Sequence, residues 1–171
     1  MSFCFVPDFI ARKLTDISPG FLRSEKIEVL LCDLDNTISL HRHKRPPDEV
    51  FRWKKTLDEA GIELVLFSNN RRGRASRNAR MLGVKCFERI GKPRTAGFFE
   101  AARVTDVPLN RMALAGDQIF TDVLGANRAE VKSIWVVPID RRVPHIWLRF
   151  AFERLVVAVN MIFGGKTFEK L

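Results

Sequence analysis

Residues 27–37 read IEVLLCDLDNT, and this stretch decides the fold. An apolar run within residues 28–32 ends directly at Asp33, and a second aspartate follows at Asp35. A short apolar run of this kind predicts a buried strand. Its carboxyl end would carry two acidic side chains two residues apart, which is a candidate site for nucleophilic or metal-assisted chemistry.

Strand-like and helix-like segments alternate along the chain on both sides of this run. Further strands are expected at residues 62–67, 84–87, 112–115 and 133–137. Helices are expected at residues 48–60, 74–82, 95–104 and 121–128. The first helix has prolines before it and Gly61 after it, which are ordinary start and stop signals. The alternation predicts an α/β fold with a three-layer, doubly wound parallel sheet.

Polar side chains follow the predicted strands at the points where the strands end. In parallel sheets, ligands bind beyond the carboxyl ends of the strands, so these side chains are expected to meet at one edge. They are Asp33 and Asp35 after the first strand, Ser68, Asn69 and Asn70 after the second, Lys92 after the third, and Asp117 after the fourth.

These residue types suit phosphoryl transfer. One aspartate of the Asp33–Asp35 pair would attack phosphorus, and its neighbour would donate a proton and later withdraw one. Asp117, with Asp122 five residues on, would complete a Mg²⁺ site, because magnesium is held by one or two carboxylates plus phosphate oxygen and water. Lys92 would neutralise charge on the transferring group. The side chains expected to hold the substrate phosphate are Asn36, Thr37, Ser68, Asn69 and Asn70.

At these residues the sequence resembles a known family. DLDNT at residues 33–37, Ser68 in LFSNN, Lys92 in GKP, and GDQIFTD at residues 116–122 resemble, in order and spacing, the four motifs of the haloacid dehalogenase superfamily of phosphatases. The resemblance implies an aspartyl-phosphate on Asp33, acid–base catalysis by Asp35, and phosphate orientation by Ser68 and Lys92. It also implies a Mg²⁺ site formed by the Asp33 side chain, the Asp35 backbone carbonyl and Asp117, with Asp122 supporting it.

No lid domain is expected over this site. The intervals from Thr37 to Ser68 and from Ser68 to Lys92 are both shorter than the roughly 50 residues of a small independent domain. An open site suits a phosphate carried by something large, such as a lipid, a nucleic-acid end or a protein.

Longer matches resemble one branch of the superfamily. PPDEVFRWKKTLDEAGIEL at residues 46–64, VLFSNNRRGR at residues 65–74 and GDQIFTDVLGANRA at residues 116–129 are similar to phosphatidylglycerophosphatases, which implies phosphatidylglycerophosphate as the substrate. The basic loop HRHKR at residues 41–45 departs from the branch, and His41 and His43 are interpreted as loop residues rather than metal ligands. Two alternatives stay open: a phosphatase for a soluble or macromolecular ester, and a non-catalytic membrane- or RNA-binding module.

Composition indicates the kind of partner and the cellular compartment. The chain has 171 residues and a formal net charge of +9, which favours an anionic partner such as a phosphate ester, an anionic phospholipid surface or a nucleic acid. The three scattered cysteines, Cys4, Cys32 and Cys86, form no disulfide framework and favour a reducing compartment, so a cytoplasmic location is expected.

The two ends of the chain differ from the predicted phosphatase domain, residues 1–140. Residues 141–171 form a basic, aromatic tail that begins with Arg141 and Arg142 and contains a helix over residues 146–163. Its few polar residues fall on one stripe, so it is either an interfacial membrane helix or a helix packed on the sheet or on a second copy. Within residues 1–24, a second membrane contact is possible through Phe3, Phe5, Phe9 and Ile10.

Overall fold

The computed structural model describes residues 4–70, 73–140, 144–164 and 167–171. Phe3, Arg141 and Arg142, which the sequence assigned to membrane contact or to the basic tail, lie outside the described residues. The strands are β1 (Phe9–Ala11), β2 (Val29–Cys32), β3 (Glu63–Ser68), β4 (Lys85–Glu88), β5 (Met112–Gly116), β6 (Lys132–Val136) and β7 (Glu169–Lys170). The helices are η1 (Leu14–Asp16), α1 (Pro19–Ser24), α2 (Asp48–Glu59), α3 (Arg74–Leu82), α4 (Ala96–Thr105), η2 (Leu109–Arg111), η3 (Ile119–Val123), α5 (Leu124–Arg128) and α6 (Pro144–Gly164).

The predicted α/β fold is confirmed. Every strand and helix expected between residues 28 and 137 is present with its ends within three residues of the prediction, and the helix expected at residues 121–128 is divided between η3 and α5. The strands form one parallel sheet in the order β4-β3-β2-β5-β6-β1-β7. The chain winds in one direction from β2 to β4 and in the other from β5 onward. The carboxyl end of β2 therefore lies at the point where the strand order reverses, which is where such sheets bind ligands.

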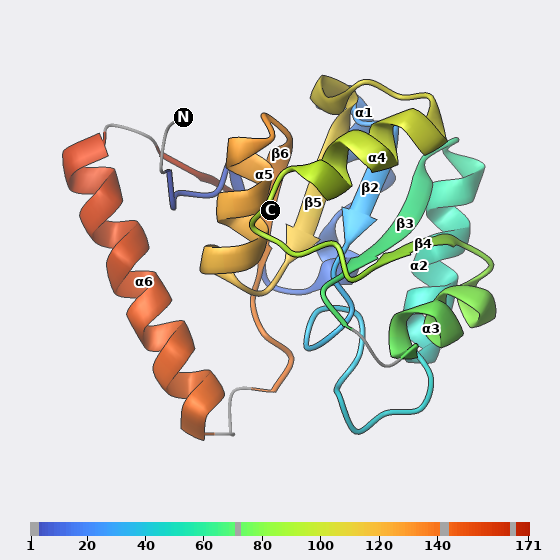
Figure 1. Ribbon diagram of the computed structural model, residues 1–171, viewed down its shortest axis with the longest axis horizontal. Helices are drawn as coiled ribbons and strands as arrows, with labels where there is room; N and C mark the ends of the chain where they lie inside the picture. Colours follow the sequence, from blue (N-terminus) through green and yellow to red (C-terminus); the bar gives the residue numbers. More distant parts are fainter. Residues whose placement is uncertain (1–3, 71–72, 141–143, 165–166) are drawn as a thin grey trace.

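Helices cover both faces of the sheet and form three layers (Figure 1). On one face, side chains of α1, α2 and α3 such as Leu22, Leu57 and Leu82 pack against the sheet in one buried cluster. On the other face, α4 and α5 contribute Phe98 and Ala126 to a second buried cluster. The alternation of apolar side chains along β2 serves both layers, because all four of its residues are buried.

Four elements at the ends of the chain were not predicted from the sequence: β1, η1, α1 and β7. β1 and β7 extend the sheet beyond β6. The expected membrane contact is wrong for Phe9, which is buried in β1; Ile10, also in β1, is partly buried and packs against a third apolar cluster. Phe5 is partly buried and packs against the same cluster, with its ring centroid 5.5 Å from that of Phe120.

The long helix α6 lies at the edge of the molecule, beside α5 (Figure 1). Phe150 and Val157 are its buried residues in the third apolar cluster, together with Trp135 of β6. No helix in the described ranges is both long enough and apolar enough to cross a bilayer.

Candidate active site

The parallel register brings the predicted site residues together at one edge of the sheet. Cys32 at the end of β2 pairs with Leu66 of β3 and with Ala115 of β5. Asp33, Ser68 and Asp117 therefore leave three adjacent strands side by side. The backbone N–H of Asp33 donates to the Ala115 carbonyl at 2.9 Å, which holds the first aspartate beside β5.

Lys92 is the centre of this cluster. Its Nζ donates to Asp33 Oδ1 at 2.8 Å and to the Phe67 carbonyl at 2.8 Å, and it lies 2.6 Å from Asp122 Oδ1. The lysine and both carboxylates are buried. An ion pair in such surroundings is strong but depends on both partners staying in place. The lysine thus holds a fixed positive charge directly beside the predicted nucleophile.

Asn69 positions the lysine rather than pointing at a free phosphate site. Its side-chain amide donates to the Lys92 carbonyl at 3.1 Å and accepts from the Lys92 N–H at 2.7 Å. The sequence predicted Asn69 as a phosphate-binding residue and did not predict this clamp. The clamp connects the loop after β3 to the loop that carries Lys92.

Asp35 faces the same site from the loop after β2. Asn70 Nδ2 donates to its Oδ2 at 3.2 Å, His41 Nδ1 lies 3.3 Å from its Oδ1, and Arg74 Nη1 at the start of α3 also donates to Oδ1. The carboxylate is one-third exposed. It is therefore held in position while remaining open to solvent and substrate.

The remaining predicted phosphate-binding residues serve the loops around the site. Ser68 is buried, and its Oγ accepts the backbone N–H of Asn70 at 3.1 Å. Asn36, in the left-handed region at φ 65°, exchanges hydrogen bonds with the backbone of Asp140 at 2.9 and 3.4 Å. The buried Thr37 Oγ1 makes no hydrogen bond to any described residue.

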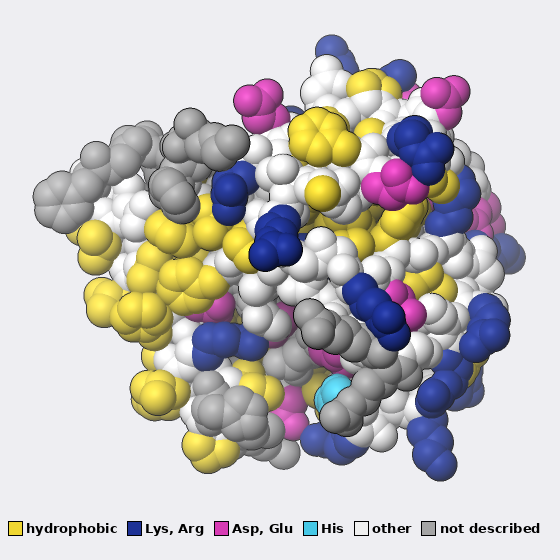
Figure 2. Space-filling view, in the orientation of Figure 1, with side chains coloured by type: hydrophobic (Ala, Val, Ile, Leu, Met, Phe, Trp, Pro, Cys, Tyr) yellow, Lys and Arg dark blue, Asp and Glu magenta, His cyan; other side chains and the backbone are white. Residues whose placement is uncertain are grey.

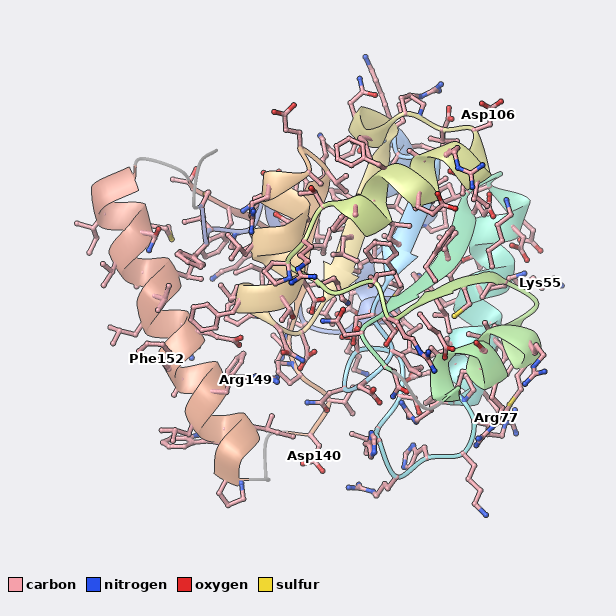
Figure 3. The ribbon with its side chains drawn as sticks, in the orientation of Figure 1. Lys55, Arg77, Asp106, Asp140, Arg149 and Phe152 are labelled. Carbon is pink, nitrogen blue, oxygen red and sulfur yellow. The ribbon has the colours of Figure 1, made fainter. Side chains whose placement is uncertain are left out.

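Asp117 lies at the end of β5 and is fully buried. Arg149 Nη2 of α6 donates to its Oδ2 at 2.5 Å, and Trp135 Nε1 donates to its backbone carbonyl at 3.0 Å. Among the described residues, its Oδ1 has no hydrogen-bond partner. Figure 3 shows Arg149 pointing from α6 toward the rest of the molecule.

Burial dominates the electrostatics of the site. It raises the pKa of Asp33 to about 6, against the lowering effect of Lys92. Burial, together with the negative charges of Asp33 and Asp122, raises the pKa of Asp117 to about 8. For Lys92, burial acts to lower the pKa, but the carboxylates of Asp122 and Asp33 outweigh it and the pKa is raised. The three carboxylates of Asp33, Asp117 and Asp122 are therefore balanced only in part by Lys92 and Arg149.

The predicted Mg²⁺ site can be tested against these contacts. Within the described ranges, no group of three or more His, Cys, Asp or Glu side chains is arranged to hold a metal ion. The predicted donor set needs only two carboxylates, Asp33 and Asp117, and the Asp35 carbonyl, which is an ordinary protein share of a magnesium shell. The unpartnered Asp117 Oδ1 and the excess of negative charge fit a divalent cation. Asp122 instead pairs with Lys92 and accepts the Gln118 N–H at 3.1 Å.

Three residues of the site were not found from the sequence: Arg74, Arg149 and Glu153. Glu153 is fully buried, and its Oε1 accepts the Ile119 N–H at 3.0 Å. Burial raises the pKa of Glu153 to about 7. The basic and acidic residues on an otherwise apolar stretch were visible in the sequence. The sequence did not show which strand end these charged residues face.

The fold and the site define a class of protein. A parallel sheet with a nucleophile candidate at its reversal point, a lysine fixed beside it, and acidic residues from two strand ends is typical of the haloacid dehalogenase superfamily of phosphatases. The chain belongs to this superfamily. A HAD-hydrolase-like family model matches residues 89–137, which carry Lys92, Asp117 and Asp122.

A curated relative extends over most of the chain. The chain is 30% identical over 135 residues to the probable phosphatase YqeG of Bacillus subtilis, covering 79% of this chain and 78% of the relative. Two solved structures share the fold. One is the cobalt-bound deoxy-D-mannose-octulosonate 8-phosphate phosphatase YrbI of Haemophilus influenzae, with a TM-score of 0.53 and 18% identity over 66% of this chain and 69% of that one. The other is an uncharacterised protein of Corynebacterium glutamicum, with a TM-score of 0.53 and 26% identity over 73% of this chain and 96% of that one.

Proposed function

We propose that the protein is a magnesium-dependent phosphomonoesterase that acts through a phosphorylated Asp33. The observation that carries this proposal is the buried ion pair between Lys92 and Asp33 at the reversal point of the sheet. A fixed ammonium group beside a carboxylate offers charge stabilisation for a phosphoryl group that the carboxylate attacks. The superfamily and the relative called a probable phosphatase support the same reaction class.

The chemistry divides into two displacements. A carboxylate oxygen of Asp33 attacks phosphorus, the ester P–O bond breaks, and Asp35 gives its proton to the leaving alcohol oxygen. Water then attacks the phosphoryl group on Asp33, Asp35 takes the proton of this water, and inorganic phosphate leaves. Two easier steps thereby replace one difficult step.

A divalent cation held by Asp33, the Asp35 carbonyl and Asp117 would neutralise the phosphate oxygens and screen the carboxylates from the incoming anion. The chain itself supplies the orientation. Asn69 fixes the loop of Lys92, and Arg74 with Asn70 fixes Asp35. In an ester complex, the Lys92 ammonium would share its hydrogen bonds between Asp33 and the phosphoryl group.

The proposed substrate is phosphatidylglycerophosphate. The likeness of residues 46–74 and 116–129 to phosphatidylglycerophosphatases supports it. So does the form of the two connections beside the site: the described residues that lead to β3 and to β4 form the helices α2 and α3 and not a lid domain. The net charge of +9 favours an anionic substrate surface. Cytoplasmic placement, at the face of the membrane where such a lipid is reached, is part of this proposal.

Phosphate release tests the reaction. Asp33→Asn is expected to abolish magnesium-dependent hydrolysis of para-nitrophenyl phosphate without loss of folded structure. Asp106→Asn is a matched control, because Asp106 lies at the end of α4, far from the site in Figure 3, at a φ of 57° that asparagine also tolerates. Equal activity in the wild type and Asp33→Asn would refute the mechanism.

Substrate comparison tests the lipid. Phosphatidylglycerophosphate in mixed micelles is expected to give a kcat/KM far above that of soluble sugar phosphates, nucleotides and 3′-phosphorylated oligonucleotides. A preference for any of the soluble or nucleic-acid esters would reject the lipid substrate and leave the phosphatase reaction intact. Vesicle or RNA binding without any phosphate release would instead favour a non-catalytic binding module.

A further inference from the structure

The outward side of α6 is apolar along its length. Trp147, Leu148, Phe152, Leu155, Val159 and Ile162 are between 42% and 75% exposed. At about 100° per residue these positions fall within a sector of roughly 140° on the helix. We call this set the outer face of α6. Figure 2 shows apolar side chains gathered along this edge of the molecule, whereas Lys and Arg gather toward the opposite edge.

One member of the outer face, Phe152, also contacts the rest of the fold, because its ring stacks on that of Phe120 with 5.9 Å between centroids. The inward side of α6 has its own contacts: Phe150 lies 5.3 Å from Trp135 between ring centroids, Val157 is buried, and Glu153 accepts the Ile119 N–H. A surface helix normally places polar residues on its outer side. An outer face that is apolar while the inner face is already packed indicates a binding surface.

Charge identifies the partner. Glu153, the only acidic residue of α6, is fully buried, so the outer face presents no carboxylate. Arg154 is exposed and lies next to Trp147 on the helix surface, at the border of the outer face. The net charge of +9 opposes self-association and attracts the molecule as a whole to an anionic lipid surface, while Arg154 supplies the positive charge at the border of the outer face itself.

We propose that the outer face of α6 docks on a bilayer that contains anionic phospholipid, with the helix lying in the plane of the interface. Its Trp, Phe and Leu side chains would enter the boundary between headgroups and acyl chains, and Arg154 would contact lipid phosphates. The proposal rests on the proposed function, because it explains how an active site without a lid reaches a phosphate carried by a lipid.

The docking surface continues into the active site. A cavity of about 690 Å³ is bordered by α6 through Trp147, Phe150 and Arg154, and by Leu40 and Arg42 from the loop after β2. An adjoining cavity of about 370 Å³ shares Leu40 and Arg42 and reaches Asp35, Asp117 and Arg149. A phosphate group at a bilayer under α6 would therefore lie on the side of the molecule where these two cavities border the partly exposed Asp35.

Tryptophan fluorescence gives a direct readout of docking. Trp53 and Trp135 are buried, and Trp147 is 59% exposed, so the outer face carries the one exposed indole among the chain's three tryptophans. With the full-length chain, vesicles of phosphatidylcholine and phosphatidylglycerol are expected to shift the emission to the blue, and brominated acyl chains to quench it. Pure phosphatidylcholine vesicles are expected to bind at least tenfold more weakly. Absence of quenching with bound protein would overturn the assignment of the surface.

A matched pair of variants tests the residues. Phe152 and Phe99 are 56% and 58% exposed, on α6 and α4 respectively. Phe152→Asp is expected to lower the vesicle partition coefficient by about tenfold or more, whereas Phe99→Asp leaves it unchanged. Leu155→Asp repeats the test on the outer face without removing a contact between aromatic rings, such as that of Phe152 with Phe120. Equal losses in Phe152→Asp and Phe99→Asp would refute the proposal.

Two further outcomes are decisive. If the wild type sediments as a dimer that Leu155→Asp dissociates, and neither binds vesicles, the outer face is a self-interface and the proposal is wrong. Hydrolysis of para-nitrophenyl phosphate in the same variants separates this proposal from the proposed function. Docking that fails while hydrolysis persists overturns only the membrane surface, and docking without hydrolysis overturns only the phosphatase.

Discussion

Gly116 is the position where a single added carbon should disturb the site most. It ends β5 directly before Asp117, and a Cβ built on it would lie 2.3 Å from Asp122 Cγ and 2.4 Å from Asp122 Oδ2. These separations are far below contact distance, so Asp122 would have to move. Asp122 is buried, pairs with Lys92 at 2.6 Å and accepts the Gln118 N–H at 3.1 Å, and both contacts would be strained.

The cost of Gly116→Ala combines two effects. Overpacking a core costs about 1–3 kcal/mol, and breaking a buried ion pair costs about 3–5 kcal/mol. Because the pair would be weakened rather than removed, we expect the free energy of unfolding to fall by about 3–5 kcal/mol in total. At about 2–4 °C per kcal/mol for a chain of this size, the melting temperature should fall by roughly 10 °C.

Urea denaturation of Gly116→Ala and Gly20→Ala measures this difference. Gly20 lies in α1, where a new Cβ would meet only Ser18 Oγ at an ordinary 3.8 Å, so Gly20→Ala should be neutral or stabilising by up to about 1 kcal/mol. Phosphatase activity should fall in Gly116→Ala alone. Stability of Gly116→Ala within about 1 kcal/mol of the wild type would refute the close packing of Asp122 against β5.

Three more outcomes follow from the same cluster. Lys92→Met leaves Asp33 and Asp122 buried without their shared cation, so urea denaturation should show a loss of about 3–5 kcal/mol; an unchanged midpoint would contradict the ion pair. The pKa of Asp33 is raised to about 6 and the attacking form is the carboxylate, so phosphate release at limiting Mg²⁺ should rise with pH through that value. Saturating Mg²⁺ should move this rise to lower pH. A pH profile that does not change with the Mg²⁺ concentration would count against Asp33 as a ligand. Arg149→Gln removes a positive charge from Asp117, so Mn²⁺ binding followed by electron paramagnetic resonance should tighten by about tenfold, and weaker binding would show that the guanidinium instead positions the ligand.

The sequence predicted the central part of the fold because hydrophobic periodicity is clear there. Residues 29–32 and 63–68 are nearly all buried, so their apolar runs stand out from the polar loops around them. The site followed from the same pattern, since polar residues at the ends of parallel strands must meet. Asp33, Lys92 and Asp117 lie together as predicted.

The remaining features depend on contacts that no local pattern encodes. β1 is three residues long and follows Pro7 and Asp8, and β7 is two residues long, so neither gives a strand signal of its own. Arg149 lies 32 residues from Asp117 in sequence, and only the packing of α6 brings them together. The role of Asn69 was also hidden, because an amide that clamps a loop and an amide that binds phosphate look the same in sequence.

The pairing of β7 with β1 changes how the C-terminal helix can be studied. Glu169 N–H donates to the Asp8 carbonyl and Leu171 N–H to the Ile10 carbonyl, both at 2.9 Å, so the polypeptide returns to the sheet after α6. The chain is consequently anchored to the sheet on both sides of α6, by β6 before it and by β7 after it. A truncation designed to delete this helix would also remove β7, one of the two neighbours of β1, and leave an unsatisfied strand edge, which invites aggregation. Point substitutions that keep both attachment points are therefore the sounder way to separate what this helix contributes from what the sheet requires.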